Sequence, residues 1–448
     1  MTNNKKLISI FMIMALVMGV IAGCSSSNNN NTGSNQSGNS NTDSGSESQT
    51  LRLSLFAGGY GEEVWNKTID AFKQANPDVV VEVELSPTNS ETLRINFLEG
   101  SPPDLYFANA SHFDSYRLIS EGLLTSLEDV LAVDAPVGDG KFGDMLIPSI
   151  IDGLRVNDEL YLMPFDTLVF GQFYDQHLFD QNGWTAPENL EQFMQVGNEM
   201  IANHIAPFTY TGVYPVYFTW SVVPLIGSIG GPEILEKIEN NVEGAWKDPA
   251  VIEAFERIKD LNDNGFIQKG VLSFDHTQAQ MEFINRRAAT VVSGTWIENE
   301  MEGNWPDDFE LRFLGNPWNK PGESQYVSIA ASVLGVPKDA KNPELAKEFI
   351  KFMFTDEIMQ LWADEVGVLR PLENLDNYAA GLPESLLDAI QSLNSPNIAT
   401  HVQLFTDKYP EVLKALGDGL NALIDGSITI DQLTDNLEAA TKITRESE

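Results

Sequence analysis

Residues 51–85 read LRLSLFAGGYGEEVWNKTIDAFKQANPDVVVEVEL and decide the fold class. Leucine stands at every second position of residues 51–55, a period of two that predicts a half-buried strand. A glycine-rich turn follows, and apolar residues at helical spacing then run up to Pro77, which ends the helix. The valines of residues 79–83 alternate again and predict a second strand. This order predicts parallel pairing through a right-handed crossover, and therefore an α/β fold.

Strand and helix patterns continue to alternate along the rest of the chain. Thr429 and Gln432 have the spacing of a capping box at the start of the last helical pattern. We find no internal repeat and no heptad pattern, so the sequence indicates a globular α/β protein. Strand-like runs lie at 104–108, 161–163, 289–292, 311–314 and 332–336, and helical patterns lie at 190–201, 249–264, 344–354, 385–393 and 432–440.

Composition and charge exclude several classes of protein. The chain has 448 residues, of which 42% are hydrophobic, enough for about two domains with a sizeable core. Its 27 Lys and Arg against 65 Asp and Glu give a net charge of −38, which argues against a nucleic-acid partner. The only cysteine is Cys24, so neither an intramolecular disulfide nor a cysteine-based zinc site is expected.

The first 50 residues indicate export and anchoring. Lys5 and Lys6 precede an apolar run over 7–22, which is shorter than a membrane-spanning helix and typical of a signal peptide. The run ends in VIAGC, which resembles the lipobox of bacterial lipoproteins and predicts a signal peptide at 1–23 and lipidation of Cys24. A plain secretory signal that ends in cysteine is the alternative. Residues 24–50 are then a lipidated cysteine and a disordered Ser/Asn/Gly linker.

No catalytic, metal or cofactor motif is convincing. Residues 138–143 match GxGxxG, but they lie in a Pro/Gly/Asp-rich loop rather than between a strand and a helix. The five histidines lack HExxH spacing, and no nucleophile elbow is present. We therefore expect no catalytic residue, no metal and no cofactor. Asp and Glu are abundant, so a carboxylate pair of the glycosidase kind stays an alternative, although no such pair stands out.

Short motifs are spread over most of the chain: residues 100–105 read GSPPDL and residues 342–352 read NPELAKEFIKF. They resemble segments of the extracellular solute-binding lipoproteins of ABC importers, in the carbohydrate group that includes maltose-binding protein. The order and spacing of all these motifs identify the chain as a member of that family. The other stretches that resemble family segments are 71–81, 159–167, 174–179, 217–220, 230–231 and 283–296.

The resemblance implies a two-lobed, periplasmic-binding-protein-like (Venus-flytrap) α/β fold with three crossings between the lobes. The N-terminal lobe is expected at 51–166 plus 329–368. The C-terminal lobe is expected at 167–328 plus 369–448. A ligand is expected in the cleft between them, where hinge closure acts.

A sugar site needs flat aromatic rings against the apolar face of a pyranose and hydrogen-bonding groups around its edge. The stretch 207–224 is rich in aromatic residues and proline and lacks the spacing of a core helix, which leaves Tyr217 and Trp220 to face either the cleft or the core. Trp296 follows a strand and a glycine, where ligands tend to bind, and the family commonly stacks this Trp on sugar. Trp318 lies in a loop that lines the cleft in this prediction.

Polar candidates follow from the loops that form the cleft in the family. Gly59 and Tyr60 lie in the first loop, and Asn109 and Ser111 follow the third predicted strand. Asp166 and Arg370 lie at the first and third crossings, where they either contact ligand, form a hinge salt bridge or are solvated surface charges. The ligand-binding residues predicted from the sequence are thus Gly59, Tyr60, Asn109, Ser111, Asp166, Tyr217, Trp220, Trp296, Trp318 and Arg370.

The expected function is extracellular carbohydrate binding without catalysis. The resemblance implies a mono- or oligosaccharide ligand captured by lobe closure. It also implies delivery to the transmembrane subunits of an ABC permease with a cytoplasmic ATPase. We expect a monomer held by its lipid on the extracytoplasmic face of a bacterial membrane. A secreted glycoside hydrolase and a surface adhesin lipoprotein remain the alternatives.

Overall fold

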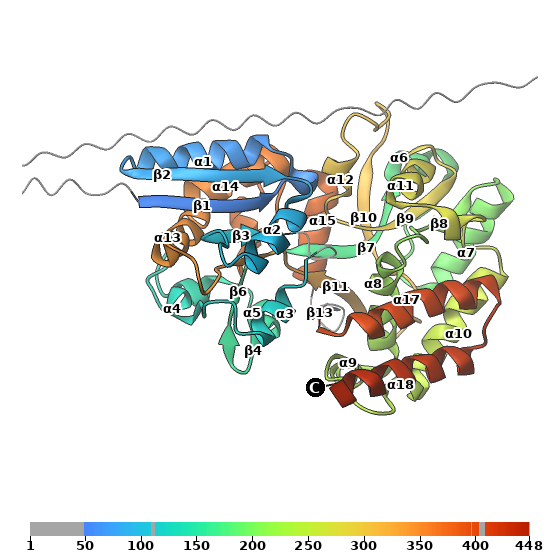
Figure 1. Cartoon of the computed structure of the whole chain (residues 1–448). Helices are drawn as coiled ribbons and strands as arrows, with labels where there is room; N and C mark the ends of the chain where they lie inside the picture. The colour runs from blue at the N-terminus through green and yellow to red at the C-terminus, as the bar shows by residue number, and fades with distance from the viewer. Residues whose placement is uncertain (1–48, 109–112, 396, 403–407, 448) are drawn as a thin grey trace, which may run out of the picture. The chain divides into compact units, whose positions relative to one another are not determined.

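The computed structural model describes residues 49–447, apart from 109–112, 396 and 403–407, and shows two main β-sheets with helices around them (Figure 1). The strands are β1 (Gln49–Phe56), β2 (Val79–Ser86), β3 (Leu105–Phe107), β4 (Arg155–Val156), β5 (Glu159–Leu160), β6 (Leu162–Pro164), β7 (Leu168–Asp175), β8 (Ala206–Thr209), β9 (Ala288–Gly294), β10 (Leu311–Gly315), β11 (Gln325–Ala330), β12 (Val333–Gly335) and β13 (Ile398–Val402). The α-helices are α1 (Glu63–Ala75), α2 (Asn89–Leu98), α3 (Ser115–Ser120), α4 (Glu128–Leu131), α5 (Pro148–Leu154), α6 (Gln176–Asn182), α7 (Leu190–Ala202), α8 (Val216–Gly230), α9 (Pro232–Glu239), α10 (Pro249–Asp263), α11 (His276–Ile284), α12 (Ile297–Glu300), α13 (Pro343–Met353), α14 (Asp356–Val366), α15 (Glu384–Leu393), α17 (Pro410–Asp425) and α18 (Ile430–Ser447). Short 3₁₀ helices are η1 (Gly58–Tyr60), η3 (Phe142–Met145), η4 (Ala245–Lys247), η5 (Val271–Ser273) and η6 (Leu375–Tyr378).

The first sheet has the strand order β2–β1–β3–β12–β6. Strand β1 pairs in parallel with β2 and β3, which confirms the strand–helix–strand unit predicted at 51–85. Helix α1, which links β1 to β2, packs against α13 and α14 (Figure 1), and the rings of Phe72 and Phe349 meet there at 5.0 Å. Because β2 is the edge strand, Val80 and Val83 remain exposed.

The second sheet has the order β13–β11–β7–β9–β8, and β10 also pairs with β7. Strand β7 runs antiparallel to β9, β10 and β11 and is buried along almost its whole length. A strand that is buried on both faces does not alternate between apolar and polar residues. For this reason the sequence does not predict β7 as a strand. Helices α8, α10 and α17 pack together in this part of the chain, where they share a core that includes Phe255 and Leu420.

The stretch 207–224 corrects one expectation. Its lack of helical spacing suggested that it was not a core helix, yet Val216–Gly230 forms α8. Residues on almost every side of α8 are buried, so its sequence carries no polar face and hence no amphipathic period. The capping box predicted at the chain's last helix is confirmed, because Gln432 N donates to Thr429 Oγ1 at 3.2 Å and Thr429 N donates to Gln432 Oε1 at 2.9 Å.

The chain passes between the two sheets three times, in the segments that follow β6, β11 and α14. Backbone hydrogen bonds join the first crossing to the other two: Phe165 N donates to Ser332 O at 2.7 Å, and Thr167 N donates to Leu369 O at 2.6 Å. The three crossings therefore meet at one junction. Strand β12, within 329–368, belongs to the first sheet and β13, within 369–448, to the second, while the lobe limits given by the sequence stay predictions.

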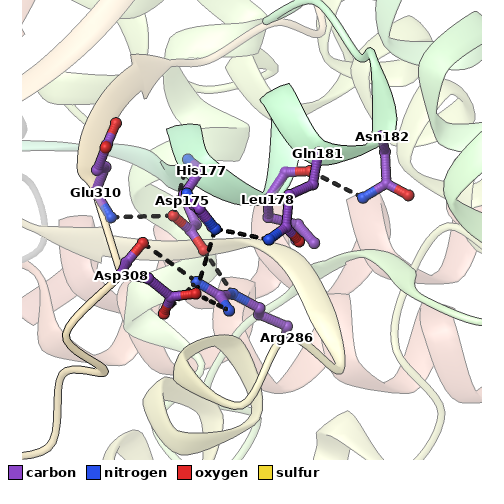
Figure 2. Close-up of polar contacts among 8 residues, drawn as sticks. All are labelled: Asp175, His177, Leu178, Gln181, Asn182, Arg286, Asp308 and Glu310. Carbon is purple, nitrogen blue, oxygen red and sulfur yellow. Dashed lines mark hydrogen bonds and ion pairs between the residues drawn. The ribbon is translucent and has the colours of Figure 1, made fainter.

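A polar network fastens three elements of the second sheet (Figure 2). Asp175 caps α6 by accepting from His177 N at 3.1 Å, and it also accepts from Glu310 N at 3.0 Å ahead of β10. Arg286, just before β9, donates through Nε to Asp175 at 2.7 Å and pairs with Asp308. Arg286 has a φ of +59°, an uncommon conformation for a residue with a side chain. Arg286 lies where the chain leaves α11, and the hydrogen bonds from Arg286 N to Phe283 O at 2.7 Å and from Arg287 N to Glu282 O at 2.9 Å close this turn, while the two carboxylates hold the Arg286 side chain.

Candidate ligand-binding site

Tyr217, Trp220 and Trp296 are partly exposed and form one aromatic cluster on the buried ring of Phe170. Trp220 stacks on Phe170 with 4.0 Å between ring centroids, and Trp296 meets Trp220 edge-on at 5.6 Å. Tyr217 lies 4.8 Å from Trp220 and 5.8 Å from Trp296. We call these four residues the aromatic platform. The structure thus brings together three residues that the sequence singled out separately as ligand contacts.

Three neighbouring elements position the platform. Tyr217 and Trp220 are three residues apart near the start of α8, so they lie on the same face of that helix. Phe170 of β7 pairs across the sheet with Gly294, the last residue of β9. A Cβ on Gly294 would lie 2.1 Å from the Trp296 ring, so only glycine leaves room for that indole. The glycine before Trp296 therefore decides where the Trp296 ring lies.

Asp166 is fully buried where the crossings meet. Tyr60 Oη donates to Asp166 Oδ2 at 2.6 Å, and Ser332 N donates to Oδ1 at 2.6 Å. Burial raises the pKa of Asp166, and the two hydrogen bonds act in the opposite direction. This carboxyl group thus links η1 to the first two crossings.

Arg370 is 2% exposed and stabilises the third crossing at the same junction. Its guanidinium lies 4.3 Å from the ring centroid of Phe165 and 5.1 Å from that of Trp362, and Nη1 donates to Phe165 O at 2.9 Å. Burial lowers the pKa of Arg370 to about 9, whereas the charge of Asp166 raises it. Within the described residues, Nε and Nη2 have no hydrogen-bond partner.

The ligand contacts expected of Asp166 and Arg370 are therefore corrected. Neither side chain offers a surface to a ligand in this structure, with exposed fractions of 0% and 2%. Both lie at the junction of the crossings, as the sequence predicts, and their burial also contradicts the alternative of a solvated surface charge. The two groups act on each other electrostatically, because, against the larger effect of burial, the charge of Arg370 lowers the pKa of Asp166 and the charge of Asp166 raises the pKa of Arg370.

Trp318 is a second correction. Its ring is fully buried and packs on Phe208 at 5.1 Å and on Phe218 at 6.0 Å. A ring with no exposed face cannot stack on a sugar, so the structure places Trp318 in the core instead. Trp318 does lie in a loop, as the sequence predicts. The sequence does not predict that this loop packs on β8 and α8.

The first loop lies next to the segment that follows Trp296. Gly59 is exposed in η1, and Tyr60 is partly buried there with its hydroxyl group bound to Asp166. Helix α12, which begins directly after Trp296, contacts η1. A contact of Gly59 or Tyr60 with ligand stays a prediction. Asn109 and Ser111 lie outside the described residues, as does Cys24.

Sequence reasoning missed a polar group beside the platform. Gln280 Nε2 donates to Glu300 Oε2 at 2.6 Å, and His276 Nε2 lies 3.5 Å from Glu300 Oε1. Burial raises the pKa of Tyr217, and the nearby charge of Glu300 raises it further. One feature of the sequence could have pointed to Glu300: it follows Trp296 by four residues, which is about one helical turn, so the two residues lie on the same side of a helix.

A surface hollow of about 560 Å³ between α7 and α10 is a poorer candidate. Both cationic side chains of its lining are already paired, since Arg257 binds Glu253 and Glu323, and Lys320 binds Glu253. Within the described ranges, no group of three or more His, Cys, Asp and Glu side chains is arranged to hold a metal ion. The helices described here include none that is long and apolar enough to span a membrane.

Two sheets joined by three crossings, with an aromatic cluster beside a loop of the first sheet, define a two-lobed α/β binding protein. Residues 58–360 match the family of bacterial extracellular solute-binding proteins, so the chain belongs to this family. The match covers more than half of the chain and confirms the family that the sequence motifs indicated. It also identifies the protein class as extracellular.

Relatives and a solved structure agree with this assignment. The diacetylchitobiose binding protein of Streptomyces coelicolor is 25% identical over 318 residues, which are 69% of this chain and 67% of that protein. The multiple sugar-binding protein of Streptococcus mutans is 22% identical over 348 residues, or 77% of each chain. The structure of a chitin oligosaccharide binding protein superposes with a TM-score of 0.69 at 21% identity, covering 89% of this chain and 100% of that one. The predicted fold class is confirmed, and these proteins carry the names of binding proteins rather than of enzymes.

Proposed function

We propose that the chain binds an oligosaccharide non-covalently on the aromatic platform. The observation that carries this proposal is the cluster of three partly exposed rings, Tyr217, Trp220 and Trp296, on one buried ring. Stacked and edge-on rings at these distances present apolar faces that match the C–H face of a pyranose. The names of the relatives, which refer to sugars, support the same class of ligand.

Lobe closure completes the proposed mechanism. The chain passes between the two lobes at the junction of the three crossings, in the described segments β6–β7 and β11–β12 and in the segment after α14. A ligand that contacts both lobes in the closed form only shifts the equilibrium towards closure. The contact of η1 with α12 supports such a double contact, because it places a first-sheet loop beside the short helix that follows Trp296.

The proposed setting is the extracytoplasmic face of a bacterial membrane. Lipidation of Cys24 anchors the protein there, and residues 25–48 act as a polar tether, which is two residues shorter than the sequence predicted because β1 begins at Gln49. The closed, sugar-loaded monomer then docks on the transmembrane subunits of an ABC permease, which a cytoplasmic ATPase drives. Membership of an extracellular solute-binding family supports this setting.

Titration with a panel of saccharides tests the binding proposal. The panel contains chitobiose, longer chitin oligosaccharides, raffinose, xylo-oligosaccharides and maltodextrins, with a peptide mixture as the control. We expect at least one saccharide to bind with a Kd of about 1 µM or lower, near −8 kcal/mol, and to be recovered unchanged. Calorimetry measures the affinity and chromatography of the recovered sugar detects turnover. Binding of peptides alone, or cleavage of the sugar, would contradict the proposal.

Gly294→Ala tests whether the position of the Trp296 ring matters. The added methyl group cannot fit 2.1 Å from the indole, so the ring must leave its place on the platform. We expect the affinity for the saccharide to fall about tenfold or more, together with a change in tryptophan fluorescence. Ser293→Ala is the matched control, because the Ser293 hydroxyl has no hydrogen-bond partner in the described part of the chain. Equal affinities of the two variants would show that the ring position is irrelevant.

A further inference from the structure

Glu300 places a carboxylate at the edge of the aromatic platform. It is the last residue of α12, and its backbone N–H donates to the Trp296 carbonyl at 2.9 Å. Residues four apart lie on the same face of a helix, so Glu300 shares its face of α12 with Trp296. Its charge also acts on the Tyr217 hydroxyl. Glu300 therefore lies one helical turn from Trp296 and within electrostatic reach of Tyr217.

The surroundings of Glu300 fix its position and leave it accessible. Gln280, which is 2% exposed, donates to Oε2 at 2.6 Å from the protein side, and His276 lies 3.5 Å from Oε1. The Glu300 side chain is still 28% exposed. An ionised carboxylate offers about four acceptor positions, of which these neighbours use only part. Glu300 is thus a fixed acceptor with free capacity towards solvent.

A second observation comes from Gln280 itself. Its Oε1 atom is buried and, within the described residues, accepts no hydrogen bond. A buried acceptor without a partner costs free energy, and structures usually supply a donor to such an atom from water or a ligand. The residue that holds the Glu300 carboxylate therefore has a further buried acceptor of its own that lacks a donor among the described residues.

We infer that Glu300, held by Gln280, accepts a hydrogen bond from a hydroxyl or amide N–H group at the edge of the saccharide ring and thereby determines which saccharide binds. This inference rests on the proposed function. Stacking on aromatic rings orients the plane of a sugar and tolerates many arrangements of its hydroxyl groups. A fixed carboxylate discriminates between them, because a sugar without a donor at that position leaves a desolvated charge unpaired.

Glu300→Gln tests the inference, with Glu302→Gln as its matched control two residues away on the exposed surface. For the tightest saccharide of the panel, we expect Glu300→Gln to weaken binding at least tenfold and Glu302→Gln to change it less than twofold. Calorimetry provides both affinities, and thermal unfolding checks that the variants remain folded. An affinity of Glu300→Gln within twofold of the unchanged protein overturns the inference. Absence of any saccharide binding by the unchanged protein overturns the proposed function instead.

Analogues of that saccharide, each lacking one donor, identify the partner of Glu300. One analogue should bind the unchanged protein at least tenfold more weakly than the parent sugar, yet bind Glu300→Gln about as well as the parent does. This loss of discrimination is the coupling that a double-mutant cycle measures. Gln280→Met, which removes the donor that positions the carboxylate, should reduce the same discrimination by a smaller factor. If every analogue is discriminated equally by both proteins, Glu300 has no role in specificity.

Discussion

Trp296→Ala removes most saccharide binding and leaves the fold intact. Trp296 is partly exposed, lies edge-on to Trp220 at 5.6 Å and extends the platform beyond α8. Truncating a Trp at the centre of a binding surface costs about 2–4 kcal/mol, and we expect an affinity loss of about 100-fold or more. Titration calorimetry with the tightest saccharide measures this loss.

Trp305→Ala is the control for that prediction. Trp305 is also partly exposed, but its ring packs on Phe309 at 5.0 Å and its indole N–H donates to Glu298 O. We expect this variant to bind the saccharide like the unchanged protein. We expect Trp296→Ala to lower the melting temperature by only a few degrees, since its ring is not part of the buried core. A large fall in melting temperature with unchanged affinity would make Trp296 a core residue.

Asp166→Ala has the largest expected effect on stability. The change leaves Tyr60 Oη and Ser332 N without their acceptor and removes the charge that stabilises the buried guanidinium of Arg370. Losing one partner of a buried polar arrangement costs about 3 kcal/mol or more. We therefore expect the melting temperature to fall by at least about 5 °C, which differential scanning calorimetry measures.

Two further variants serve as comparisons for the loss of stability expected of Asp166→Ala. Asp166→Asn keeps one acceptor oxygen, so we expect it to lose less stability than Asp166→Ala. Asp70→Ala changes an exposed side chain on α1, where surface substitutions stay within about 0.5 kcal/mol. Equal melting temperatures of Asp166→Ala and Asp70→Ala would contradict the view that Asp166 holds the crossings together.

The sequence predicts elements best where one face meets water. Helix α1 and strand β1 show clear apolar periods, and the capping box at Thr429 is a local pattern with a local cause. Strand β7 and helix α8 escape detection because both are buried on nearly all sides and have no polar face to set a period.

The candidate site likewise contains residues that the sequence reveals and residues whose position only the fold reveals. Tyr217 and Trp220 are recognisable because they lie in a stretch rich in aromatic residues and proline, and Trp296 because it follows a strand and a glycine. The burial of Trp318 and Arg370 depends on segments far away in the chain, as does the contact between Gln280 and Glu300, twenty residues apart. Such pairings are set by tertiary packing and leave no trace in the spacing of the residues.

Diffraction from crystals grown with the tightest saccharide of the panel tests the central claim most directly. We expect density for an intact sugar with one pyranose face against Trp296 or Trp220, and with groups of both lobes around its edge. Density for the sugar in the hollow between α7 and α10, with the aromatic platform empty, would contradict the account.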